Sequence, residues 1–246
     1  MIADASSTET IDHSGWQQIL NLYLVTDTSD GINRFDYAAV TEADRVRLQS
    51  YINSLTSIDP RDYNRPEQLA YWINLYNALT VKIVLDNYPV KSIRSISWGL
   101  FGIGAGPWNK KFVEVADIEL SLNDIEHRIL RPIWRDPRIH FVVNCASLGC
   151  PNLAAEAFTP ANNEQLMQQG GRDFINHPRG VMFDDKGKLV MSSIFNWYDS
   201  DFGSTQAERL QYLAGFAEPE LSARLAAYSG DISYDYDWAL NQPAVD

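Results

Sequence analysis

The sequence predicts an α+β fold: a single globular domain, rich in helices, with a small mixed or antiparallel sheet. Helical periodicity covers more of the chain than strand alternation, and the strands come partly as hairpins, which disfavours a doubly wound sheet. With 246 residues, 45% of them hydrophobic, the chain can bury a substantial core. No repeat, low-complexity tract or Pro/Gly-rich linker divides it. We therefore expect a flexible segment at residues 1–14 and one α+β domain over residues 15–246.

The clearest predicted helix follows Pro66, a residue that suits the first turn of a helix. Residues 67–87 contain no Gly or Pro, their apolar side chains recur at three- and four-residue steps, and Pro89 ends the pattern. Thr41 and Ser121 are the expected N-caps of two other helices. Helices are expected at residues 16–24, 41–58, 67–87, 121–130, 151–157 and 165–174. Strands are expected at residues 32–37, 111–120 and 138–145 and, as a hairpin, at 180–183 with 188–192, and residues 234–238 are a strand or a docking tail.

The charge of the chain narrows the classes of partner. The formal net charge is −12, no Lys/Arg stripe offsets it, and such a field repels phosphate backbones and anionic membrane surfaces. We therefore expect no nucleic-acid partner. No run of 18 apolar residues is present, so no membrane insertion is expected. Residues 1–14 lack the basic start and apolar core of a signal peptide, which leaves a cytoplasmic protein or a periplasmic or secreted one already trimmed.

One run near the middle of the chain, residues 136–151, concentrates the reactive side chains. It holds both cysteines, Cys145 and Cys150, together with His140 and Asn144. We interpret it as a buried strand that enters a loop of small residues, a common way to build a site. On strict alternation Cys145 points into the core, whereas Cys150 precedes a predicted helix whose N-terminus would lower the pKa of the thiol. Both cysteines are therefore candidate nucleophiles, and a disulfide between them is an alternative in an oxidising compartment.

A thiol nucleophile needs a base, and two histidines lie close in sequence. His127 and His140 are the candidates, with Asn144 or Glu126 as the group that orients the imidazole. Glu126 and His127 cannot share a helical face, so either His127 pairs with a cysteine or Glu126 enters the site while His127 points outward. The backbone amides of residues 146–149 would hold an oxyanion. A zinc site formed by two His and two Cys is a further alternative, although the spacing matches no standard pattern.

Other side chains are candidates for substrate contact. Asn74 and Asn77 lie one turn apart on an apolar helix, so they either cap neighbouring loops or orient a catalytic group or ligand. The candidate substrate-binding residues are Trp72, Asn74, Asn77, Arg138, Trp197, Tyr198 and Asp201. The glycines at 102, 104 and 106 look superficially like a phosphate loop, but they lack its strand, Lys-Ser/Thr pair and helix, so we expect a loop.

Several separate motifs resemble one family, the domain-of-unknown-function 547 family of bacteria and plants. They are YWINLYNA at 71–78, YPVKSI at 88–93, DIEHRILR at 124–131, the 136–151 run and FNWYDSDF at 195–202. The resemblance covers roughly residues 16–240 and implies no settled activity. A weaker resemblance, of residue type only, is to papain- and transglutaminase-like enzymes. In those enzymes the nucleophile precedes the histidine, so His140 before Cys145 would require a permuted arrangement.

The sequence thus leads to three functional hypotheses. The first is a thiol-dependent hydrolase or acyltransferase that acts on an amide or ester and needs no cofactor. The second is a non-catalytic module that binds a peptide or glycan in an aromatic groove. The third is a zinc-binding site. The substrate or ligand is a small molecule, a peptide or a glycan, and the oligomeric state is left open.

Overall fold

The structure is a computed structural model that describes residues 2–96 and 106–244. Its helices are α1 (Ser14–Tyr23), α2 (Glu42–Thr56), η1 (Pro60–Asp62), α3 (Arg65–Asn87), η2 (Ile93–Ser95), the π-helix η3 (Asp124–Leu130), α4 (Arg131–Trp134), η4 (Pro137–Phe141), α5 (Asn163–Ile175), α6 (Ile194–Trp197), α7 (Asp199–Phe202), α8 (Gln206–Ala214) and α9 (Pro219–Ala227). Its strands are β1 (Leu24–Val25), β2 (Arg34–Phe35), β3 (Val113–Val115), β4 (Ile118–Leu120), β5 (Val181–Phe183), β6 (Leu189–Ser192) and β7 (Ser233–Asp235). Helices dominate and the sheets are small, which confirms the α+β prediction.

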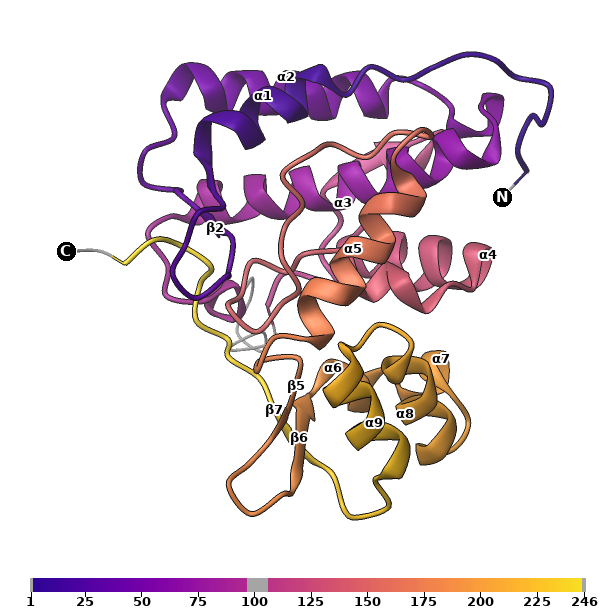
Figure 1. The fold of residues 1–246 in the computed structure, drawn as a ribbon. Coiled ribbons are helices and arrows are strands. Elements are labelled where there is room, and N and C mark those ends of the chain that lie inside the picture. Colours follow the sequence, from indigo (N-terminus) through magenta and orange to yellow (C-terminus); the bar gives the residue numbers. More distant parts are fainter. Residues whose placement is uncertain (1, 97–105, 245–246) are drawn as a thin grey trace.

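The sheet that carries the C-terminal part of the chain is mixed. β5 and β6 form the predicted antiparallel hairpin, and β7 pairs with β6 in parallel, with Met191 opposite Tyr234. The other sheets, β1–β2 and β3–β4, are two-stranded hairpins. Figure 1 shows β5, β6 and β7 below the layer of α1, α2 and α3, with α6, α8 and α9 beside the sheet. The parallel return of β7 brings residues after 235 back towards the middle of the molecule.

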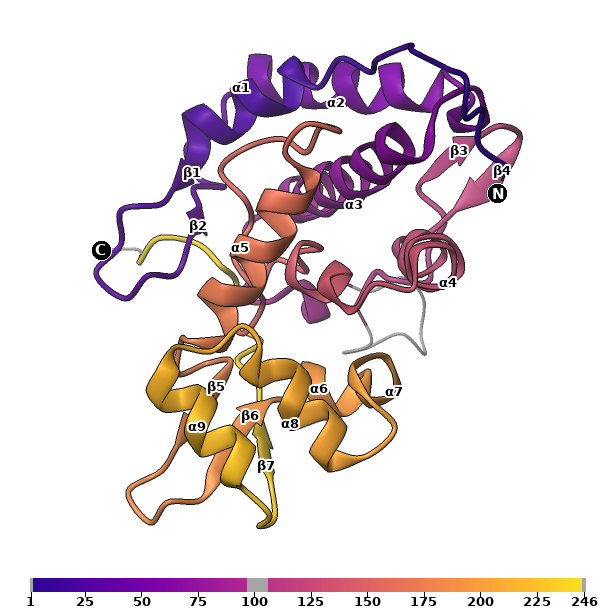
Figure 2. The ribbon, with the colours of Figure 1, turned by 45° about the vertical axis from the view of Figure 1, so that its right-hand side comes forward.

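Two hydrophobic cores lie on either side of the segment around η4. The larger one is formed mainly by α1, α2 and α3 and the smaller one by β5, β6 and the C-terminal helices. Phe141, at the end of η4, belongs to the smaller core, whereas Ile139 and Val142 belong to the larger one. α5 lies between the two groups of elements in both views (Figures 1 and 2). η4 and the loop after it are therefore held from both sides.

α3 is the central helix, and its caps match the sequence signals. The side chain of Asn64 accepts a hydrogen bond from Glu67 N, and Pro66 lies in the first turn. Nearly every side chain from Ala70 to Leu85 is buried, because α2, η3, α5 and η1 pack around the helix. The helix ends at Asn87, before Pro89. Thr41 caps α2 as predicted, and its side chain accepts from Asp44 N.

The prediction of a strand over residues 138–145 is wrong. Residues 137–141 form the 3-10 helix η4, and an irregular loop follows. Asp136 caps this helix by accepting a hydrogen bond from Arg138 N, and Pro137 fixes φ at the first helical position. This local capping overrides the β propensity of the apolar residues that follow. The alternation of faces inferred from a strand, and the core-facing orientation of Cys145 that followed from it, do not apply.

Two further element predictions need correction. Residues 111–120 form the β3–β4 hairpin instead of one strand, because Ala116 and Asp117 both adopt positive φ in a two-residue turn. Residues 151–157 form no helix. This segment is irregular, and Asn74 anchors the residue that follows it, because the Asn74 side chain donates to Phe158 O and accepts from Phe158 N. Cys150 therefore does not cap a helix, and the helix-terminus argument for its reactivity is lost. The proposed loop at the glycines 102 and 104 lies outside the described residues.

His13 connects the N-terminal segment to the larger core. Its ring is buried, Nδ1 lies 2.7 Å from the Tyr51 hydroxyl, and Nε2 has no hydrogen-bond partner among the described residues. Burial lowers the pKa of His13 to about 4, against the weaker effect of Asp12. The neutral ring is thus the form that fits the folded protein.

His13 is expected to make the protein acid-sensitive. Its folded pKa lies below the unfolded value near 6.5, so its contribution is complete above pH 6.5 and is lost as the pH falls towards 4. When the pH falls from 7 to 4.5, the free energy of unfolding of the wild type should decrease by about 2 kcal/mol more than that of the His13→Gln variant. Urea titrations of both proteins at the two pH values measure this difference. Equal losses in the two proteins would rule out His13 as the source.

Candidate functional site

A pocket of about 260 Å³ lies where α3, η3, η4, α6 and the chain after β7 meet. Its described lining is Tyr76, Trp108, Asn109, Asn123, Glu126, His140, Val143, Cys145, Cys150, Ile194, Trp197, Tyr198, Tyr236 and Trp238. The pocket thus brings both cysteines, His140 and Glu126 to one surface. Glu126 comes from η3, His140 from η4 and both cysteines from the loop after η4, and Tyr236 follows Cys145 by 91 residues.

Three asparagines hold the loop that carries Cys145. Asn77 on α3 donates to Val142 O (2.9 Å) and accepts from Asn144 N (2.8 Å). The side chain of Asn144 in turn accepts from Ala146 N and donates to Pro151 O. Asn241 N donates to Ala146 O, which ties the loop to the C-terminal segment. The loop-capping alternative for Asn74 and Asn77 therefore matches their hydrogen bonds.

The backbone between the two cysteines is unusual at Ala146. This residue is buried and has φ +59°, a left-handed conformation that non-glycine residues rarely adopt. The N–H of Ala146 is taken by Asn144, that of Leu148 by Ala239 O and that of Gly149 by Asp237 O. These amides already have acceptors, so the expected oxyanion hole of backbone N–H groups in residues 146–149 is not formed by them.

The two sulfur atoms are close neighbours. Cys145 Sγ lies 2.8 Å from Cys150 Sγ, 3.0 Å from the Tyr236 hydroxyl and 3.2 Å from Ser147 Oγ. Cys145 is partly exposed, whereas Cys150 is buried and accepts a hydrogen bond from Cys145 N. Among the described residues, no hydrogen bond joins either sulfur to an imidazole. Cys145 is thus the sulfur that a ligand would meet first.

The pair favours one negative charge on sulfur. Burial opposes ionisation of Cys150, but hydrogen bonds from the Cys145 thiol, the Tyr236 hydroxyl and Cys145 N lower its pKa to about 7. The hydrogen bond to Cys150, together with burial, raises the pKa of Cys145. The two thiols titrate as a unit, so the first proton leaves the pair at a lower pH than an isolated thiol would lose it.

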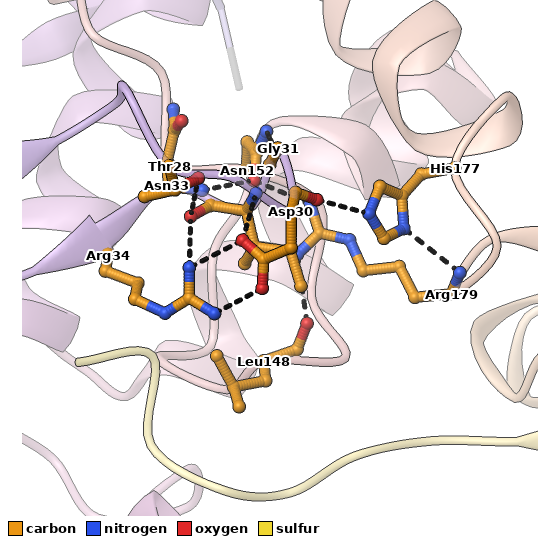
Figure 3. A network of polar contacts seen from close by, with 10 residues as sticks. Thr28, Asp30, Gly31, Asn33, Arg34, Leu148, Asn152, His177 and Arg179 are labelled. Atoms are coloured by element: carbon orange, nitrogen blue, oxygen red, sulfur yellow. Dashed lines mark hydrogen bonds and ion pairs between the residues drawn. The ribbon is translucent and has the colours of Figure 1, made fainter. Parts of the chain in front are cut away.

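Arg179, a residue that the sequence interpretation missed, holds the far side of the cysteine loop. Its guanidinium donates to Leu148 O (3.0 Å) and to Asn152 Oδ1 (2.6 Å), two residues on either side of Cys150 (Figure 3). Asp30 pairs with Arg34 instead, and Arg179 has no carboxylate partner among the described residues. Burial lowers the pKa of Arg179 to about 10, and the electrostatic effect of Cys150 opposes this shift.

His140 is fixed by a hydrogen bond and by stacking. Nε2 lies 2.7 Å from Asp201 Oδ2, which also accepts from Arg131 Nε at 2.6 Å. The ring stacks on Tyr198 with centroids 4.2 Å apart. The hydrogen bond from His140 holds the pKa of Asp201 well below its usual range, and Arg131 adds to this effect. Nδ1 lies 3.7 Å from Glu126 Oε1 and has no hydrogen-bond partner within residues 2–96 and 106–244.

η3 separates Glu126 from His127, which decides between the two arrangements left open by the sequence. Glu126 lines the pocket, where Oε2 accepts from the Tyr76 hydroxyl at 3.1 Å. His127 lies next to Arg131, with 3.0 Å between His127 Nδ1 and an Arg131 amino nitrogen, and lines a separate hollow. Burial lowers the pKa of His127 despite the opposing charge of Glu126. Glu126 is thus at the pocket and His127 is outside it.

The other candidate residues fall into two groups. Trp197 and Tyr198 line the pocket, and Asp201 lies behind His140. Trp72 is buried and lines a different hollow near β4, and Arg138 is paired with Asp136 and Glu164. The side chains of Asn74 and Asn77 form hydrogen bonds with the backbone of neighbouring loops. In the structure these last four residues do not line the cysteine pocket.

An aromatic wall closes one side of the pocket. The ring of Trp238 contacts Tyr236 (4.6 Å between centroids), Trp197 (5.5 Å, stacked) and Trp108 (5.8 Å, edge to face). Trp197 is 45% exposed, and the amides of Asn109 and Asn123 lie at the same pocket. Of these residues, only Trp197 was a substrate-binding candidate from sequence. The motif YDYDW at 234–238 was the available signal for Tyr236 and Trp238.

Comparison with known proteins gives a family match for the central part of the chain. Residues 60–175 match the family described as "Protein of unknown function, DUF547". These residues belong to the DUF547 family. No curated protein and no solved structure matches the chain. The DUF547 match contains α3, Glu126, His140 and both cysteines, whereas Asp201 and Tyr236 lie beyond it.

In residues 2–96 and 106–244, no group of three or more His, Cys, Asp or Glu side chains is arranged to hold a metal ion. Within the same ranges, none of the helices combines the length and the apolar character needed to cross a membrane.

Proposed function

We propose that the pocket lined by Cys145 and His140 is the active site of a thiol-dependent hydrolase or acyltransferase that acts on an amide or ester, with Cys145 as the nucleophile. One observation carries this proposal: the partly exposed sulfur of Cys145 lies between a second thiol and a hydroxyl donor, in a pocket that His140 and Glu126 also line. Nucleophile, proton acceptor and oxyanion donor are the groups that acyl transfer needs.

The dithiol supplies an activated nucleophile. At rest the pair shares one proton near neutral pH, with Cys150 holding the negative charge and Cys145 donating its thiol hydrogen. When Cys145 Sγ attacks a carbonyl carbon, its proton moves along the existing 2.8 Å contact to Cys150. Cys150 thus serves as the immediate base, and the buried position keeps it from competing for substrate.

The Tyr236 hydroxyl is the proposed oxyanion donor. It lies 3.0 Å from Cys145 Sγ, and burial raises the pKa of Tyr236, so the hydroxyl stays protonated at neutral pH. A donor beside the attacking atom can follow the negative charge onto the carbonyl oxygen of the tetrahedral intermediate. Ser147 Oγ, 2.8 Å from the same hydroxyl, orients it.

His140 is the proposed proton donor to the leaving group. Asp201 and Tyr198 fix the ring, and the free Nδ1 faces Glu126 at the pocket. No hydrogen bond links His140 to Cys145. We therefore expect His140 to contact the leaving group of the substrate, either directly or through a bound water. Asp201, held by Arg131, is the group that orients the imidazole.

The test is capture of an acyl-enzyme. Incubation with a panel of p-nitrophenyl esters and aryl amides is expected to add one acyl group to Cys145, located by peptide mass spectrometry. Cys145→Ala should abolish the adduct, and Tyr236→Phe should slow its formation by roughly 10²-fold, as loss of one oxyanion donor does. Trp72→Phe, which alters an aromatic residue outside this pocket, is the matched control.

Two results would refute the proposal. One is a hydrolytic rate unchanged in Cys145→Ala for every substrate found. The other is an adduct on Cys150 alone, because that would assign the nucleophile to the other sulfur.

The aromatic wall favours a second candidate, a non-catalytic module that binds a peptide or glycan. The contiguous rings of Tyr236, Trp238 and Trp197 next to two amide side chains are suited to stacking and hydrogen bonding. This candidate predicts a ligand that quenches tryptophan fluorescence equally in the wild type and in Cys145→Ala, without turnover in either.

A further inference from the structure

We propose that Cys145 and Cys150 are a redox pair: a small hydroperoxide oxidises Cys145 in the pocket, and Cys150 resolves the product to a reversible intramolecular disulfide. This inference goes beyond acyl transfer and does not rest on it, since its readout is the state of the sulfur atoms. It assigns to the pocket a second chemistry, the two-electron reduction of a peroxide.

Proximity is the first observation that supports the pair. The two sulfur atoms are 2.8 Å apart in the structure, whereas a disulfide bond measures about 2.05 Å. Cys145 N donates to Cys150 Sγ, so the backbone of one cysteine already holds the sulfur of the other. The hydrogen bonds of Asn144 and Arg179 anchor the loop on both sides of this contact. A bond between the sulfurs therefore requires only a small movement of side chains.

The unequal exposure of the two cysteines is the second observation. Cys145 is partly exposed, while Cys150 is 3% exposed. A peroxide in the pocket therefore meets Cys145 first, and Cys150 is held behind it. An accessible thiol beside a resolving cysteine is the usual arrangement of redox-reactive pairs.

The chemistry balances with the peroxide as oxidant. Cys145 Sγ attacks the terminal oxygen of the hydroperoxide while its proton passes to the Cys150 thiolate, and the O–O bond breaks. The departing alkoxide or hydroxide takes that proton from Cys150 and leaves as alcohol or water. Cys145 is now a sulfenic acid. The Cys150 thiolate attacks the sulfenic sulfur, the S–S bond forms and the S–O bond breaks, and the departing hydroxide takes a proton from solvent to become water. One molecule of the dithiol dithiothreitol, or two molecules of the monothiol glutathione, return both thiols by exchange and become a disulfide themselves.

Two hydroxyl groups are placed to assist the first step. Tyr236 OH and Ser147 Oγ lie within 3.2 Å of Cys145 Sγ and are hydrogen-bonded to one another. They can donate to the departing oxygen while the sulfur attacks. If Cys145 is also the acyl-transfer nucleophile, the disulfide removes its free thiol and stops that reaction.

The test treats the folded, reduced protein with one to five equivalents of hydrogen peroxide and follows it by intact mass and peptide mapping. The expected product is a Cys145–Cys150 disulfide, lighter by two hydrogen atoms, that dithiothreitol reverses completely. In Cys150→Ser, Cys145 should stop at a sulfenic acid that dimedone captures. In Cys145→Ser, oxidation of Cys150 should be slower by at least about tenfold, because its sulfur is buried.

The wild type alone can overturn the proposal if the variants do not fold. Two free thiols after peroxide treatment, oxidation of Cys145 to the sulfinic acid without a bridge, or a disulfide that dithiothreitol cannot open in the folded protein would each contradict it. Acyl-enzyme formation is measured separately on the reduced protein. Its failure would refute acyl transfer and leave the redox pair standing, and the reverse also holds.

Discussion

Replacing Arg179 with methionine is expected to raise the pKa of the thiol pair and to slow alkylation of the native protein at pH 7 by roughly tenfold. Arg179 is a largely buried cation without a carboxylate partner among the described residues, and its two hydrogen bonds bracket the loop of Cys150. A buried charge needs compensation. We expect a thiolate on the cysteine pair to supply this negative charge, because Cys150 raises the pKa of Arg179 electrostatically, and we expect the cation to stabilise the thiolate in return.

The measurement is the rate of iodoacetamide labelling between pH 5 and 9, with each cysteine assigned by mass spectrometry. Arg179→Lys keeps the charge and should return the midpoint towards that of the wild type, although it cannot reproduce both hydrogen bonds. Arg34→Met is the matched control, because Arg34 pairs with Asp30 in the same network. If Arg179→Met changes only the limiting rate at high pH and leaves the midpoint unchanged, then Arg179 shapes the loop without acting on the charge of the thiols.

Asn77→Ala is expected to destabilise the protein by about 2–5 kcal/mol, because it leaves two buried backbone groups unsatisfied and opens a cavity. The side chain of Asn77 is 2% exposed and bridges Val142 O and Asn144 N, which connect η4 to the cysteine loop. The melting temperature should fall by roughly 10 °C. The cysteines should also become more accessible to alkylation, since α3 would no longer anchor their loop.

Asn87→Ala is the control for this substitution. Asn87 is on the same helix, but in the part of the chain that the structure describes its side chain bonds only to Ile83 O of its own last turn, so the expected loss is within about 1 kcal/mol. Thermal unfolding followed by circular dichroism gives both values. Similar losses of unfolding free energy in the two variants would show that the side-chain amide of Asn77 contributes no more to stability than that of Asn87 at the end of the helix.

Local signals were sufficient for a good part of the fold. The capped helices α2 and α3, the helix α5 and the β5–β6 hairpin depend on periodicity, caps and turn residues within a few positions of one another. The same signals failed where two local preferences competed. At residues 137–141 the Asp136–Pro137 cap outweighed the apolar run, and at residues 116–117 two positive φ angles turned one expected strand into a hairpin.

The sequence by itself determined the α+β class, the DUF547 resemblance and the concentration of Cys145, Cys150 and His140 in one short run. Only the tertiary structure decided what surrounds them. Asp201 reaches His140 across 61 residues, Tyr236 reaches Cys145 across 91, and Glu126 takes the pocket while His127 does not. The packing of α7, the parallel pairing of β7 with β6 and the π-helical geometry of η3 bring these residues together. None of these leaves a periodic pattern in the sequence, because each depends on contacts between segments that are distant along the chain.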